Sequence, residues 1–136
     1  MANVTRRTFV AAAASAAVAA IGLPRKLAAA AAPARVMDAG HISNYSADDA
    51  YDKYRQQGFF VIRRERKIFS LSSVCTHKGC KLRVKDDLSF VCKCHGSTFD
   101  KDGHVTKGPA TKDLPRLAVR LNDAGHVLVD LDRPLS

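Results

Sequence analysis

Two short segments of the chain each place cysteine and histidine side chains close together. Residues 75–80 read CTHKGC, and residues 92–100 read CKCHGSTFD. Thiolate and imidazole groups are ligands for iron, zinc and copper, and cysteines in pairs can also form disulfides. Each segment directly follows a strand-like apolar run, 71–74 or 88–91. We therefore expect two loops at one end of a sheet, where strands hold the ligands in a fixed geometry.

A structural zinc site and a plain disulfide scaffold are the alternatives to a redox metal centre. The cysteines are separated by four residues in the first segment and by one in the second. Zinc ribbons instead use cysteines separated by two residues, so the spacing disfavours a common zinc knuckle. A disulfide scaffold leaves both histidines without a role.

The two segments resemble the cluster-binding boxes of Rieske iron–sulfur proteins. The family pattern, Cys-x-His followed by Cys-x-x-His, falls on Cys75, His77, Cys92 and His95. The resemblance implies a 2Fe–2S cluster in which two thiolates hold one iron and two imidazoles hold the other. Replacing two thiolates by neutral imidazoles makes the site less negative, which raises its reduction potential.

The resemblance also implies roles for residues around these ligands. It implies a disulfide between Cys80 and Cys94 that ties the two loops together, as in the high-potential branch found in cytochrome bc complexes. The stretch 108–110, GPA, matches a third loop that covers the cluster. Ser97 is expected to donate a hydrogen bond to sulfur, which stabilises the reduced cluster.

Three positions depart from the quinol-oxidising pattern of the family. Phe99 stands where a tyrosine is common, Lys78 replaces an apolar residue, and Lys93 replaces a proline. The ammonium group of Lys78 is strongly hydrated, so this side chain packs poorly against an apolar quinol pocket. We therefore predict one-electron transfer by an exported redox protein or small redox subunit, with no catalytic residue of its own.

The expected partners are protein electron donors and acceptors, such as a cytochrome c-like protein or a catalytic subunit. The alternative is the Rieske subunit of a quinol–cytochrome c oxidoreductase, which would contact quinol and a cytochrome b. A ferredoxin that feeds an oxygenase is disfavoured by Cys80, Cys94 and Ser97. No nucleic-acid-binding motif accompanies the net charge of +9.

Residues 1–34 are predicted to be a Tat-like signal or anchor rather than part of the fold. They contain no acidic residue, and they carry TRRTFV at 5–10 before an alanine-rich apolar stretch that ends at Leu23. This order of basic, apolar and small residues is typical of an export signal. We expect the protein in the periplasm or on the outer face of the cytoplasmic membrane, with membrane contact only through this segment if it is uncleaved.

Residues 35–136 are expected to form an all-β domain, a small antiparallel Rieske-type sandwich with the cluster-binding loops at one tip. Apolar runs at 59–62 and 68–71 flank a charged turn, and runs at 118–121 and 126–129 flank a second turn, so each pair predicts a β-hairpin. One short helix is expected from an N-cap at Ser46 to Gly58.

Overall fold

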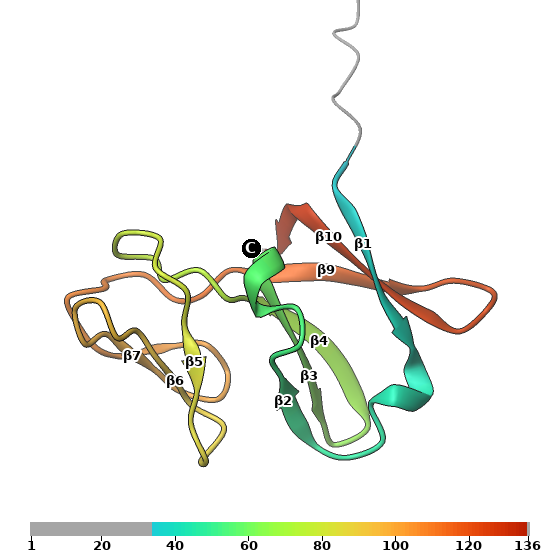
Figure 1. The fold of residues 1–136 in the computed structure, drawn as a ribbon, viewed down its shortest axis with the longest axis horizontal. Coiled ribbons are helices and arrows are strands. Elements are labelled where there is room, and N and C mark those ends of the chain that lie inside the picture. The colour runs from blue at the N-terminus through green and yellow to red at the C-terminus, as the bar shows by residue number, and fades with distance from the viewer. Residues whose placement is uncertain (1–33, 136) are drawn as a thin grey trace, which may run out of the picture. The chain divides into compact units, whose positions relative to one another are not determined.

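The computed structural model describes residues 34–135, which fold into two antiparallel sheets (Figure 1). The larger sheet has the order β1-β10-β9-β4-β3-β2. Its strands are β1 (Val36–His41), β2 (Asp49–Tyr51), β3 (Phe59–Arg64), β4 (Lys67–Ser72), β9 (Arg116–Leu121) and β10 (His126–Leu135). The smaller sheet has the order β5-β6-β7-β8. Its strands are β5 (Arg83–Val84), β6 (Phe90–Val91), β7 (Thr98–Phe99) and β8 (Val105–Lys107). The all-β, antiparallel prediction is confirmed.

Both predicted hairpins are present in the larger sheet. Strands β3 and β4 pair around a turn in which Glu65 and Arg66 have φ of 48° and 65°. Two consecutive residues with positive φ, in the left-handed region of the backbone, are typical of a tight two-residue hairpin turn. Strands β9 and β10 pair around the second predicted turn, where Gly125 has φ of 77°.

The prediction of a helix between Ser46 and Gly58 is wrong. Residues Asp49–Tyr51 form β2, which pairs with β3, and only Arg55–Gln57 form a single 3₁₀ turn, η2. Pairing with β3 buries Ala50 and outweighs the local helix signals, because tertiary contacts routinely override propensity. Gly58, which was expected to end that helix, instead ends the 3₁₀ turn in a left-handed conformation. A second 3₁₀ turn, η1, spans Ile42–Asn44.

The first four residues of β3, 59–62, lie between two hydrophobic cores, which explains why they are all apolar. Phe59 and Val61 belong to a core with residues of β9 and β10, whereas Phe60 and Ile62 belong to a core with residues of the smaller sheet. Side chains alternate between the two faces of a strand, so a strand buried on both faces must be apolar throughout. The ring centroids of Phe60 and of Phe90 in β6 are 5.0 Å apart, and this stacked contact packs the two sheets against each other.

The predicted signal at residues 1–34 lies, apart from Ala34, outside the described residues. Within residues 34–135, no helix has the length and apolar character that a membrane crossing requires.

Candidate metal centre

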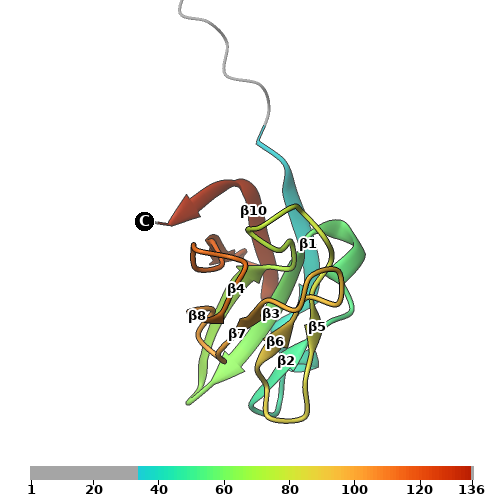
Figure 2. The ribbon, with the colours of Figure 1, turned by 90° about the vertical axis from the view of Figure 1, so that its left-hand side faces the viewer.

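The strand order of the smaller sheet brings three loops to the same end. Each strand runs antiparallel to its neighbour. The loop that leads toward β5, the loop between β6 and β7 and the loop that follows β8 therefore converge (Figures 1 and 2). We call residues 75–80, 92–97 and 107–112 the first, second and third tip loops. Both segments singled out from the sequence, and the GPA stretch, lie in them.

The first and second tip loops have matching backbone conformations. In each, the N–H of the first cysteine donates to the carbonyl five residues later, at 2.8 Å for both Cys75 and Cys92. The N–H of a glycine four residues after that cysteine donates back to its carbonyl, at 3.0 Å for Gly79 and 2.9 Å for Gly96. Both glycines have positive φ, 78° and 81°, which a side chain would strain. Each cysteine is therefore held by its own closed turn.

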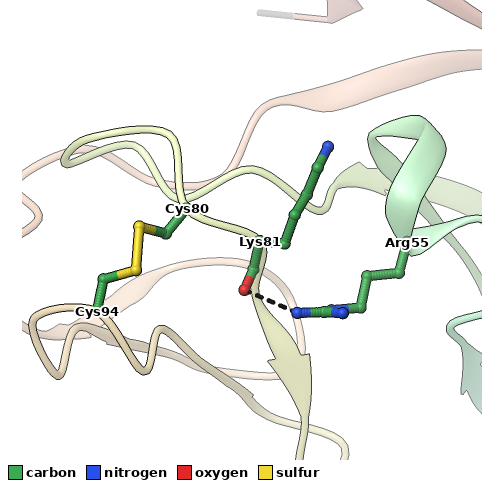
Figure 3. The surroundings of a disulfide bond; sticks show 4 residues. All are labelled: Arg55, Cys80, Lys81 and Cys94. Carbon is green, nitrogen blue, oxygen red and sulfur yellow. Dashed lines mark hydrogen bonds between the residues drawn. A yellow bond between two sulfur atoms is a disulfide. The ribbon is translucent and has the colours of Figure 1, made fainter.

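A disulfide between Cys80 and Cys94 joins these two loops, as the family resemblance implied (Figure 3). Arg55 of η2 anchors the chain just after the first loop. Its guanidinium donates to the carbonyl of Lys81 at 3.1 Å and to that of Leu82. Sequence reasoning missed Arg55, because no motif marks one arginine among many as a loop anchor.

Cys75 and Cys92 are free thiols and are almost completely buried, with 2% and 1% of their surface exposed. Burial raises the pKa of the Cys75 thiol, while hydrogen bonds from the His77 backbone N–H and from Ser97 lower it. The buried Ser97 hydroxyl oxygen accepts from the Ala110 N–H at 3.0 Å. Because the oxygen is held by that bond, the hydroxyl hydrogen is free to point at sulfur.

The two predicted histidine ligands lie next to each other. The rings of His77 and His95 have centroids 4.8 Å apart and are nearly perpendicular. The Nδ1 atom of His77 is buried and finds no hydrogen-bond partner among residues 34–135. A buried ring nitrogen without a partner is costly, and metal coordination satisfies it. His95 is exposed at the tip.

The residues present therefore fit a metal centre with mixed ligands. They offer two buried thiols and two adjacent imidazoles, one with an unpartnered buried nitrogen. The sulfur of Cys92 also lies within 4.8 Å of those of Cys80 and Cys94. Those two sulfurs are joined in the disulfide and have no thiolate to offer, so only Cys92 of the three can bind a metal.

The sequence profile of the Rieske [2Fe-2S] domain matches residues 35–118. The chain belongs to the Rieske family. A cytochrome b6-f complex iron-sulfur subunit of Prochlorococcus marinus is 32% identical over 94 residues, 65% of this chain and 53% of that protein. A cytochrome bc1 complex Rieske iron-sulfur subunit of Streptomyces lividans is 39% identical over 74 residues, 50% of this chain and 44% of that protein.

A solved structure also matches, that of the cyanobacterial plasma membrane Rieske protein PetC3 from Synechocystis. It has a TM-score of 0.54 and 30% identity, and the match covers 69% of this chain and 98% of that one. The chain spans about one third to one half of the length of the first curated relatives it matches. Membership in the Rieske family implies a 2Fe–2S cluster as the cofactor.

Three contacts fasten the third tip loop and the residue that follows it, Asp113, to their surroundings, and none of them was predicted from the sequence. The Thr76 hydroxyl donates to the carbonyl of Lys112 at 2.6 Å. Asp113 accepts from the Val105 N–H at 2.8 Å and lies 2.8 Å from Nδ1 of His104. The hydrogen bond to Asp113 raises the pKa of His104. These contacts hold Ala110 against Ser97.

Removal of the Ser97 hydroxyl should lower the midpoint potential of this Rieske centre. A Ser97→Ala variant loses a hydrogen-bond donor to the Cys75 sulfur, and a reduced cluster held there, with its extra negative charge, would depend on that donor more than the oxidised cluster would. A hydrogen bond of about 1 kcal/mol corresponds to about 40 mV for a one-electron couple. A redox titration monitored by electron paramagnetic resonance measures the shift.

Ser73→Ala is the matched control, since Ser73 is equally buried but donates to the Arg55 carbonyl. An unchanged potential in Ser97→Ala would contradict the assigned role.

Proposed function

We propose that this chain carries single electrons between protein partners, with its 2Fe–2S cluster held by Cys75, His77, Cys92 and His95. When bound, the cluster supplies a one-electron couple in the range of roughly −150 to +300 mV. The observation that carries the ligand assignment is the pairing of two buried free thiols with two adjacent imidazoles, one of them with an unpartnered buried Nδ1.

The protein's own groups set how readily an electron enters and leaves. Hydrogen bonds from Ser97 and from the His77 backbone N–H reach the Cys75 sulfur, and donors of this kind favour the reduced state. The cysteine side of the site faces the core, whereas His95 is exposed. Electrons therefore exchange at the histidine side, where a partner can approach closely.

The proposed location is the periplasm or the outer face of the cytoplasmic membrane. Support comes from the Tat-like pattern at residues 1–34, because a Tat system moves proteins that are already folded around a cofactor. The Cys80–Cys94 disulfide also suits an oxidising compartment.

A soluble carrier or small redox subunit is favoured over a quinol-oxidising subunit by one residue in particular. Lys78 is exposed in the first tip loop, where a quinol-oxidising complex would need an apolar contact surface. The alternative, a subunit beside a cytochrome b that oxidises quinol, is supported by the names of the relatives, which are subunits of cytochrome b6-f and bc1 complexes.

The purified holoprotein should contain two irons and two acid-labile sulfides per chain. Its reduced state should give the electron paramagnetic resonance spectrum typical of mixed Cys and His ligation. The protein must be made in cells with intact iron–sulfur assembly, exported, and purified without chelators. One zinc and no iron under these conditions would contradict the proposal. Co-purification of a cytochrome b with quinol oxidation activity would favour the alternative.

A further inference from the structure

The charges of the smaller sheet are separated along its strands. The three tip loops contain no aspartate or glutamate, and they carry four exposed lysines. These are Lys78 in the first loop, Lys93 in the second, and Lys107 and Lys112 in the third. Because the antiparallel order brings all three loops to one end, residues distant in the sequence form a single cationic rim around the histidines.

The opposite end of the same sheet has the reverse composition. There the β5–β6 turn, 85–89, and the β7–β8 turn, 100–104, together hold four aspartates and two lysines. One of these lysines, Lys85, pairs with Asp87 at 3.5 Å. The smaller sheet therefore has an electric dipole with its positive end at the proposed cluster site.

The carboxylate next to the rim in the sequence, that of Asp113, contacts Val105 and His104 rather than a rim lysine. None of the four rim lysines forms an ion pair with any group in residues 34–135. An oxidised Rieske cluster with two thiolates and two neutral imidazoles has no net charge, since two ferric ions balance two sulfides and two thiolates. The lysines therefore set the field that an approaching partner meets.

We propose that the cationic rim docks an acidic redox protein, whose negative patch surrounds its own electron-transfer group. This inference rests on the proposed function and names the partner's chemistry. Long-range attraction would orient the dipole so that the histidine side meets the partner first, and such steering raises association rates 10- to 1,000-fold. A membrane surface is disfavoured as the occupant, because it would cover the exposed His95 without accepting an electron.

Stopped-flow oxidation of the reduced, full-length holoprotein by two c-type cytochromes, one acidic and one basic, tests the proposal. The rate is measured from about 0.01 M ionic strength, where charges act over about 30 Å, to about 0.15 M, where they act over about 8 Å. We expect the rate with the acidic cytochrome to fall at least tenfold across this range. The rate with the basic cytochrome should rise over the same range.

Two matched double variants separate the rim from charge in general. Lys93→Gln with Lys112→Gln removes two rim charges, and Lys85→Gln with Lys101→Gln removes two from the opposite end of the same sheet. The rim variant should lose most of the salt dependence and react several-fold more slowly than wild type at low salt, and the two should converge at high salt. The opposite-end variant should keep the wild-type salt dependence. The midpoint potential of each protein is measured in parallel, so that driving force is separated from docking.

A wild-type rate with the acidic cytochrome that does not depend on salt would overturn the docking proposal. So would equal salt slopes for the rim variant and the opposite-end variant. Binding to vesicles of phosphatidylglycerol and phosphatidylcholine is the third measurement. If the rim variant loses vesicle binding relative to wild type while its cytochrome kinetics are unchanged, the rim is a membrane contact and the proposal is wrong. A protein without iron would instead contradict the proposed function itself.

Discussion

Replacing His95 with cysteine is expected to retain a 2Fe–2S cluster and to lower its midpoint potential by several hundred millivolts. The variant would hold its cluster with three thiolates and one imidazole, so the site gains a negative charge and reduction becomes less favourable. Plant-type ferredoxins, with four thiolates, lie near about −400 mV, whereas Rieske centres lie at roughly −150 to +300 mV. His95 is exposed, so its replacement disturbs little packing.

Voltammetry of the purified holoproteins measures this shift, and the absorbance spectrum shows whether a cluster is present. His41→Cys is the matched control, because His41 is also exposed but lies on β1 in the larger sheet. Its potential should equal that of wild type. If His95→Cys retained a cluster at the wild-type potential, His95 would not be a ligand. If His95→Cys held no cluster, a second variant, His95→Ala, is tested with added imidazole. If His95 is a ligand, the imidazole should take its place and restore the cluster in that variant.

Much of the fold could be predicted from the sequence because its signals are local. The β3–β4 hairpin consists of two apolar runs around a charged turn, and both the pairing and the turn follow from that pattern. The β9–β10 hairpin is marked in the same way. The segment from Ser46 to Gly58 could not be assigned correctly, since β2 forms only through pairing with β3, and a helix signal of a few residues contains no information about that contact.

In the candidate site too, some residues could be predicted from the sequence and others could not. Its cysteines and histidines are marked by type and spacing, and the third tip loop by its GPA sequence. The anchors of the loops are not marked: Arg55 reaches the residues that follow the first loop, and Asp113 reaches β8 and His104. The cationic rim was only partly predictable, because Lys78 and Lys93 were singled out from the sequence, whereas only the strand order places Lys107 and Lys112 at the same end of the sheet. Contacts between polar residues far apart in the sequence leave no periodic pattern.

Removing the Cys80–Cys94 disulfide should make the cluster labile and destabilise the protein. The bond joins the two loops that hold the proposed ligands and closes a stretch with a sequence separation of 14. A disulfide that closes about 15 residues contributes about 3 kcal/mol in the chain-entropy model. Without it the loops can separate while the rest of the domain stays folded, which exposes Cys75 and Cys92 to water. We expect the Cys80→Ser, Cys94→Ser double variant to lose its cluster about 10- to 100-fold faster than wild type.

Cluster loss is followed by visible absorbance in the presence of an iron chelator, and the free energy of unfolding by denaturant titration of the holoproteins. The double variant leaves no unpaired thiol from the disulfide, so faster loss cannot be attributed to a new reactive cysteine. Wild-type protein treated with a thiol reductant should behave like the double variant, because it lacks the same bond but keeps both side chains. A matched serine change, Ser72→Ala on β4, should leave the cluster lifetime unchanged. If the double variant kept its cluster as long as wild type, the closed backbone turn within each loop would be sufficient to hold its own proposed ligands, and the disulfide between the loops would have no role in retaining the cluster.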